Sequence, residues 1–309
     1  MATASKNSFR PTVERLEDRL VPTVTYHGGA LLTHVQAENL YLGSAWMTSG
    51  GQGMAKSLEG FSATLVNSRY MDLLTWAGYG VGRGTDYVGK VLNYNLNSYV
   101  TDGQIKGSIQ QAIRGGGVMQ PVANNLYVVF VAPGVNVVAS DGESSARQNF
   151  TGYHSYFVGT NYYGTPTYIQ YAVIAYPGHG VNPTPQYYGY PNELAALTDT
   201  ASHEIGEAAT DPRDTGWYDN RYGMSGEVGD LTNSYHQYLG SYYVQLLANK
   251  NDSPMFLTNG IYYHGVQTNR VSGLPYDAKP AASGPSIQEI AAAIDYNFGV
   301  PDALHRRGF

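Results

Sequence analysis

The amino-acid sequence predicts an α+β domain with a mixed β-sheet, and three observations lead to this class. Charged residues make up only 14% of the 309 residues, whereas the 37 glycines and 28 tyrosines indicate many short strands and turns. Apolar segments rich in Val, Ile and Tyr are typical of buried strands. Segments with a helical spacing of apolar residues lie between these strands. Strands interleaved with a few helices form an α+β or an α/β domain, and we expect an α+β domain.

The elements follow from local patterns. A helix is expected over residues 58–77, and a second over residues 102–116, where consecutive glycines end it. Strands are expected over residues 125–132, 165–177 and 244–248. The core candidates on the two helices are Phe61, Leu65, Leu73, Ile105, Ile109 and either Ala112 or Ile113.

Composition divides the chain into three regions. Residues 1–25 form a segment for export or processing, or a disordered tail, and residues 26–275 form one continuous domain. Residues 276–309 begin with a linker of small residues, "YDAKPAASGPS". Ser286 and Glu289 then form a capping box for a short helix, which a C-terminal tail follows.

Charge and composition exclude several classes of function. The net charge of −6 and the lack of a basic cluster argue against nucleic acid as a partner. The chain has no cysteine, so disulfides and thiolate ligands are excluded. No apolar run reaches the roughly 18 residues of a membrane span.

The segment "NELAALTDTASHEIGEAATDP" predicts a helix over residues 192–210. Asn192 can cap its first turn, Glu193 suits the positive end of the helix, and Pro212 cannot continue it. At 100° per residue, one narrow stripe forms the core face. This stripe contains Leu194, Leu197, Ala201, Ile205 and Ala208.

The polar side of this helix carries a candidate metal site. His203 and Glu207 lie one turn apart opposite the core stripe, so both can reach one cation at the floor of a cleft. Glu204 lies between the two faces and would be the general base, as in the His-Glu-x-x-His zinc peptidases. Here a glutamate replaces the second histidine. The alternative is an ordinary helix that exposes a His–Glu pair.

An acidic segment after the helix supplies further ligands. Glu227 stands twenty residues after Glu207, a separation similar to that of the glutamate ligand in thermolysin-like peptidases. We therefore expect one zinc ion on His203, Glu207 and Glu227, with Asp230 orienting the ligands or replacing one. The alternative is a calcium-binding or merely solvated acidic loop; however, calcium prefers oxygen ligands and has little use for His203.

Two resemblances point to the cell exterior. "RPTVERLEDRLVP" near the start is similar to a segment found in many planctomycete surface and secreted proteins. "SHEIGEAATDP", "GWYDN" and "GEVGDLT" resemble the signature of the EXORDIUM-like, phosphate-induced protein family. Further blocks, including "LYVVFVAPGVNVV" and "YYVQLLANKNDSPMF", follow in the family's order between Tyr26 and Phe256.

The family resemblance implies an extracellular or cell-wall protein linked, in plants, to growth control, without a settled activity. It also implies that the glutamate in the fourth place of the helix motif belongs to the family pattern. The chain departs from the family in lacking cysteines that members commonly have. The family block "TGYHSYF" contains a histidine, here His154, which could be a further ligand or a transition-state donor, or a packed aromatic-flanked residue.

These observations predict a single zincin-like domain with an active-site helix. The expected function is that of a zinc-dependent, peptidase-like hydrolase of the cell surface or extracellular space, acting on a peptide or a cell-wall polymer. Two carboxylates and one imidazole acidify bound water weakly, so we expect slow hydrolysis or none. The alternative is a non-catalytic cell-wall-associated binding protein, with a structural metal or none, whose tyrosines stack on sugars.

Overall fold

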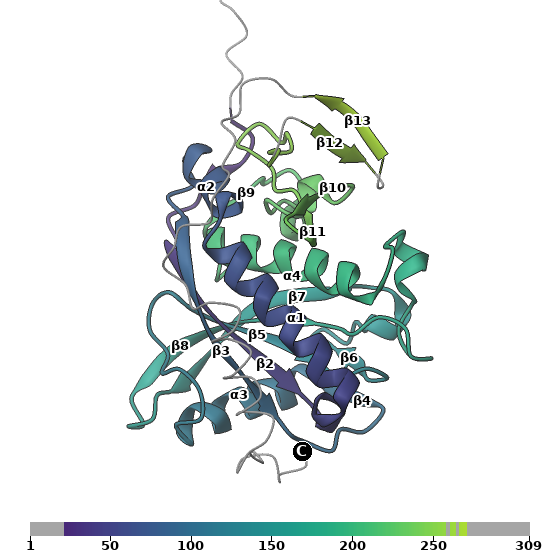
Figure 1. Ribbon diagram of the computed structural model, residues 1–309. Coiled ribbons are helices and arrows are strands. Elements are labelled where there is room, and N and C mark those ends of the chain that lie inside the picture. Colours follow the sequence, from purple (N-terminus) through teal and green to yellow (C-terminus); the bar gives the residue numbers. More distant parts are fainter. Residues whose placement is uncertain (1–21, 258–259, 264–265, 271–309) are drawn as a thin grey trace, which may run out of the picture.

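The computed structural model describes residues 22–257, 260–263 and 266–270. A five-stranded sheet lies at its centre (Figure 1), with β7 at one edge antiparallel to its neighbour and the other strands parallel. The predicted α+β class with a mixed sheet is confirmed. In spatial order the strands are β3 (Gly82–Leu92), β2 (His34–Leu42), β5 (Asn125–Val131), β8 (Pro166–Ile174) and β7 (Gly152–Thr160).

The central strands form where apolar, β-branched and aromatic residues run without interruption. Every residue of β5, "NLYVVFV", is buried, as expected for a parallel strand covered on both faces. The strands predicted over residues 125–132 and 165–177 are confirmed as β5 and β8, although β8 ends at Ile174.

Helices cover both faces of the sheet. α1 (Ser49–Val66) and α4 (Glu193–Thr210) contact each other on one face, and α3 (Asp102–Arg114) lies on the other (Figure 1). Side chains alternate between the faces along β7. The hydroxyl group of Tyr153 donates a hydrogen bond to Asp102 of α3 over 2.9 Å, so the next residue, His154, faces α4.

The helix predicted over residues 58–77 is two helices. α1 begins earlier than expected and ends at Val66, and α2 (Arg69–Trp76) follows. The cause is Ser68, which has an extended backbone and whose side-chain oxygen accepts a hydrogen bond from the backbone nitrogen of Tyr70 over 3.1 Å. The predicted core residues of these helices and of α3 are buried.

Helix α4 begins and ends as predicted. The side chain of Asn192 accepts a hydrogen bond from the backbone nitrogen of Ala195 over 2.9 Å, and the helix ends at Thr210. The predicted stripe is confirmed as a core face, with Leu194 at its half-buried edge.

The opposite face of α4 is covered as well, so fifteen of its eighteen residues are buried. β10 (Tyr235–Leu239) and β11 (Tyr242–Gln245) form a hairpin, and β11 packs on the helix. His203 and Glu207 were expected to line the floor of a cleft. The helix lies between the sheet and the hairpin (Figure 1), so Glu207 is buried, whereas His203 lines a hollow. The strand expected over residues 244–248 begins at Tyr242 and ends at Gln245.

The remaining strands form small pairs around this centre. β12 (Gly260–Tyr263) and β13 (Val266–Arg270) extend the β10–β11 hairpin into a four-stranded sheet. β1 (Thr25–Tyr26) pairs with β9 (Trp217–Tyr218), and β4 (Tyr99–Thr101) pairs with β6 (Asn136–Val138). None of the helices in the described ranges has the length and apolar character that a membrane span requires.

The structure describes only parts of the three regions expected from composition. Within the first region, Val24 is fully buried and the backbone nitrogen of Thr23 donates to the carbonyl oxygen of Lys250 over 2.8 Å. A continuous cluster of buried hydrophobic side chains extends from Val24 to Leu257. Residues 1–21, the domain boundary expected at 275 and the helix expected after Ser286 lie outside the described residues.

Because Ile205 is fully buried on the core face of α4, Ile205→Ala is expected to destabilise the fold. The lost burial and the cavity together should lower the free energy of unfolding by about 2–5 kcal/mol. Denaturant unfolding monitored by circular dichroism measures this. The control is Val158→Ala on β7, where the side chain is 65% exposed and the expected change is within about 0.5 kcal/mol. Equal unfolding free energies for the two variants would contradict the core position of Ile205.

Candidate metal centre

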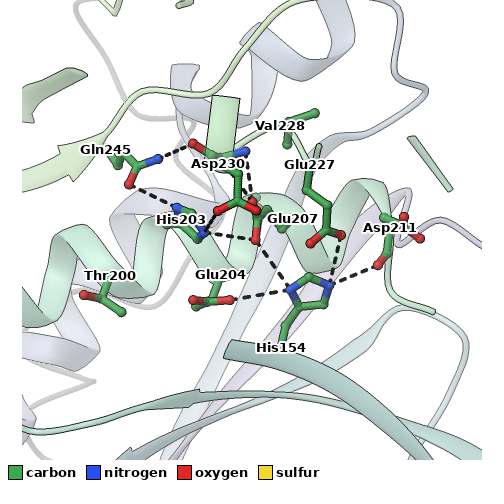
Figure 2. A network of polar contacts seen from close by, with 12 residues as sticks. His154, Thr200, His203, Glu204, Glu207, Asp211, Glu227, Val228, Asp230 and Gln245 are labelled. Atoms are coloured by element: carbon green, nitrogen blue, oxygen red, sulfur yellow. Dashed lines mark hydrogen bonds and ion pairs between the residues drawn. The ribbon is translucent and has the colours of Figure 1, made fainter. Parts of the chain in front are cut away.

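A buried polar cluster lies between α4, β7 and the segment that follows α4 (Figure 2). The register of the β7–β8 pair places His154 opposite Ala172, so its ring lies over the polar side of α4. Its Nδ1 atom is 3.5 Å from Glu204 Oε2 and 3.7 Å from Glu207 Oε2. The sheet thus brings a third chain segment to the two glutamates of the helix motif.

The other nitrogen of the His154 ring faces the chain beyond α4. Nε2 lies 3.4 Å from Glu227 Oε1 and 3.1 Å from the carbonyl oxygen of Asp211. Only 6% of the His154 side chain is exposed. This histidine is therefore at the centre of the cluster, with carboxylates on both sides of its ring (Figure 2).

His203 forms the second half of the cluster. Its Nε2 atom is 3.0 Å from Glu207 Oε2 and 3.7 Å from Asp230 Oδ1. Its Nδ1 atom lies 3.0 Å from the side-chain oxygen of Gln245, whose amide nitrogen donates to the carbonyl oxygen of Gly229 over 2.7 Å. If Nδ1 carries the proton in this contact, Nε2 is left as the nitrogen that can bind a metal.

Glu207 links the two halves. Its Oε1 atom accepts hydrogen bonds from the backbone nitrogens of Gly229 (3.1 Å) and Asp230 (3.0 Å), while Oε2 faces both histidines. A Cβ atom on Gly229 would lie only 2.8 Å from Glu207 Oε1 and from His203 Nδ1. The close approach of this backbone to the helix therefore requires glycine at this position.

Two carboxylate oxygens of the cluster, Glu204 Oε2 and Glu227 Oε1, are buried without a hydrogen bond of good geometry, and a nitrogen of His154 lies close to each, at 3.5 Å and 3.4 Å. Buried carboxylate oxygens are normally hydrogen-bonded, so this arrangement suits a cation as well as a protonated imidazole. Among the described residues, two groups have ligand atoms within 4.8 Å of one another, and each is close enough to hold a metal ion. One is His203, Glu204 and Glu207, and the other is His154, Glu207 and Glu227.

The cluster contains every residue expected at the site, but in a different arrangement. Glu227 was expected to join His203 and Glu207, yet it groups with His154 and Glu207 because it faces the end of α4 near Asp211. Asp230 Oδ1 lies 3.7 Å from His203 Nε2, close to the histidine that it was expected to orient or to join as a replacement ligand.

Glu204, expected between the faces of α4, lies close to the two residues of the polar face. His154 lies within the buried cluster and close to Glu204, so of its two expected positions it takes the one beside the candidate site. Gln245 was not expected, although a polar residue inside the apolar run "VQLLA" was a signal for it.

Burial and neighbouring charges displace the pKa values of the cluster. Burial is the main cause that raises the pKa of Glu227 to about 8 and that of Asp230 to about 7. Burial disfavours a charge on His154 and His203, but the surrounding carboxylates outweigh it and hold the pKa of each imidazole well above its usual range. Burial alone would raise the pKa of Glu207, but the neighbouring His203 and His154 outweigh burial, so the pKa of Glu207 lies below its usual value.

Hollows adjoin the cluster on two sides. A polar one of about 190 Å³ is lined by His203, Glu204 and Asp230, and it shares Phe150 and Tyr190 with a mainly apolar pocket. Another, of about 230 Å³, is lined by residues of the segment after α4. These residues are Asp211, Asp214, Tyr218, Gly223 and Glu227.

Only some of the acidic residues after α4 come together. Asp211, Asp214 and Glu227 line one hollow, whereas Asp219 forms an ion pair with Arg221 and Asp214 is exposed. The carboxylate of Asp211 accepts hydrogen bonds from the backbone nitrogens of Thr215 and Gly216. The arrangement therefore does not provide the six to eight converging oxygens that a calcium loop needs.

Comparisons of the chain with protein-family models, curated proteins and solved structures found no match.

Proposed function

We propose that the protein is a zinc-dependent hydrolase that acts on peptide bonds, with His203, Glu207 and Asp230 as zinc ligands and Glu204 as the general base. The observation that supports this most is the position of Glu204. It follows the ligand His203 directly in the chain, lines the polar hollow together with His203 and Asp230, and has a buried Oε2 atom 3.5 Å from His154 Nδ1. A residue so placed can take a proton from a water molecule in the hollow.

The donor set favours zinc over calcium. Imidazole nitrogen and carboxylate oxygen are common zinc ligands, and a catalytic zinc keeps three protein ligands and one open position. When bound, zinc would lower the pKa of a water molecule and polarise a carbonyl group. Gln245 would hold the His203 ring in position through Nδ1.

The neighbouring residues support a step in which Glu204 accepts a proton from water and later donates it to the leaving amine. His154 Nδ1, 3.5 Å from Glu204 Oε2, would stabilise the ionised carboxylate and aim it.

A peptide-library digest tests the proposal. Protein purified without chelator should cleave peptides of the library, lose this activity after treatment with a chelator, and regain it when zinc is added. Mass spectrometry of the products gives both the rate and the preference. Absence of cleavage throughout the library by zinc-loaded protein would contradict the hydrolase.

The zinc affinity is expected to rise with pH between about 6 and 8. The pKa values of His203 and Asp230 are raised, the latter to about 7, so protons compete with zinc at low pH and must leave on binding. Each proton displaced should strengthen binding by about tenfold per pH unit. Competition with a chromogenic chelator at pH 6, 7 and 8 measures this. An affinity independent of pH would mean that zinc binds elsewhere.

A binding protein without catalysis is the second candidate. Large hydrophobic side chains exposed on the described surface are mostly tyrosines, among them Tyr163 (86% exposed) and Tyr187 (62%). Exposed tyrosine rings can stack on sugars. Retention of zinc-loaded protein on insoluble cell-wall polysaccharide, together with no cleavage in the peptide library, would favour this function.

We further propose that the protein belongs to the EXORDIUM-like group and resides at the cell surface or outside the cell. The block order between Tyr26 and Phe256 and the segment "RPTVERLEDRLVP" support this. The mature protein is expected to lack the residues before about Thr23, and cell fractionation with N-terminal mass spectrometry measures this. Full-length protein that begins at Met1 and is found only in the cytoplasm would contradict the placement.

A further inference from the structure

We propose a second divalent-cation site in the same cluster, formed by His154, Glu207 and Glu227, with Glu207 shared between the two ions. This goes beyond the proposed hydrolase, in which one zinc lies on His203, Glu207 and Asp230. It rests on the geometry of the second group and would hold for a non-catalytic protein too.

The spacing of the second group suits a cation. Its three ligand atoms lie within 4.8 Å of one another, and atoms that bind one zinc ion tetrahedrally at 2.0–2.2 Å lie about 3.3–3.6 Å apart. Side-chain shifts of about 1 Å therefore close the site. Glu227 Oε1 is buried and already lies 3.4 Å from His154 Nε2, a separation that suits two ligands of one ion.

Glu207 is placed to bridge the two sites. Its Oε2 atom lies 3.0 Å from His203 Nε2 and 3.7 Å from His154 Nδ1, so one carboxylate oxygen lies beside both imidazole rings (Figure 2). Its Oε1 atom is held by the backbone nitrogens of Gly229 and Asp230. Paired metal ions in hydrolytic sites lie about 3.5–4 Å apart, a separation that a shared carboxylate can span.

The charge of the cluster also favours two ions. Among the described residues, no Lys or Arg forms an ion pair with its four carboxylates. Two divalent cations would balance four ionised carboxylates and leave both imidazoles neutral, as metal ligands must be. The four carboxylates belong to Glu204, Glu207, Glu227 and Asp230.

Each site has its own approach from the surface. The polar hollow leads to His203 and Asp230, whereas the hollow lined by Asp211 and Glu227 leads to the second site. The second ion would join three separate segments, namely β7, α4 and the chain after α4. It would thus fix His154 and Glu227 relative to the helix that carries the first site.

Metal stoichiometry tests the second site without reference to activity. The full chain is loaded with zinc, freed of excess metal, and measured by native mass spectrometry and elemental analysis. We expect two zinc ions per chain for the wild type and one for Glu227→Gln, which keeps the shape of the side chain but loses its charge. Asp214→Asn is the matched control, because Asp214 lines the same hollow, is exposed, and has a positive φ that Asn tolerates. It should bind two.

The outcomes separate this proposal from the proposed function. One zinc in the wild type that is lost in both Glu227→Gln and His203→Ala would show a single shared ion and overturn the second site. Two zinc ions retained by Glu227→Gln would remove Glu227 from the ligands. Anomalous diffraction from wild-type crystals, which needs no variant, should give two peaks beside Glu207, and one peak would overturn the proposal. Two bound ions without any peptide cleavage would contradict only the hydrolase.

Discussion

Glu204→Gln is expected to reduce peptide hydrolysis by about 10²-fold or more while the protein keeps its fold and its zinc. The amide has nearly the shape of the carboxylate but cannot accept a proton from water. The side chain of Glu204 is buried, its Oε2 atom lacks a hydrogen-bond partner, and it lines the polar hollow, so proton transfer is the function that it is placed to serve. Zinc is expected to remain because His203, Glu207 and Asp230 are unchanged.

The measurement is a digest of the peptide library by wild type and variant at equal zinc content. Glu193→Gln is the matched control: it makes the same change on the same helix, but 39% of the Glu193 side chain is exposed and it pairs with His179 instead. This control should cleave like the wild type. Equal cleavage by Glu204→Gln and the wild type would remove Glu204 from the mechanism. Loss of zinc from Glu204→Gln would instead make Glu204 a ligand.

His203→Ala is expected to lose the zinc ion of the first site and, with it, hydrolysis. The substitution removes the nitrogen ligand of that site, whose Nε2 atom lies 3.0 Å from Glu207 Oε2 and 3.7 Å from Asp230 Oδ1. Changes to residues that only orient ligands typically weaken metal binding by 10- to 100-fold, and loss of a ligand itself should exceed about 100-fold. Elemental analysis after dialysis and competition with a chelator measure this.

His179→Ala is the control, because His179 forms a His–Glu pair on the surface with 43% of its side chain exposed. It should keep the metal content of the wild type. If His203→Ala binds zinc as tightly as this control does, His203 is not a ligand. Thermal unfolding of the metal-free proteins distinguishes loss of the ion from loss of the fold, since the metal-free variant should unfold close to the metal-free wild type.

The central helix could be predicted closely because its signals are local. The cap at Asn192, the stop before Pro212 and the apolar stripe all depend on residues within a few positions of one another. The side-by-side placement of His203 and Glu207 follows from 3.6 residues per turn alone. Where local signals conflicted, as at Ser68, the predicted helix was wrong: a capping side chain broke a segment whose apolar spacing was otherwise continuous.

The rest of the cluster depends on contacts between distant segments. His154 reaches Glu204 because β7 pairs antiparallel with β8 at the sheet edge, and a slip of one residue would turn its ring to the α3 side. Glu227 lies beside His154 and Asp230 beside His203 because Gly229 brings the chain against Glu207 between them. Their spacing along the chain could not show this.

The sequence by itself therefore determined the α+β class, the helix from Glu193 to Thr210 and the pair of side chains that the helix presents, because periodicity and capping act over one or two turns. Only the tertiary structure decided that this pair is buried, that His154 and Gln245 complete it, and that Glu227 lies with His154. Strand register, hairpin packing and the close approach of Gly229 are set by hydrogen bonds and packing between residues far apart in the chain, which no local pattern records.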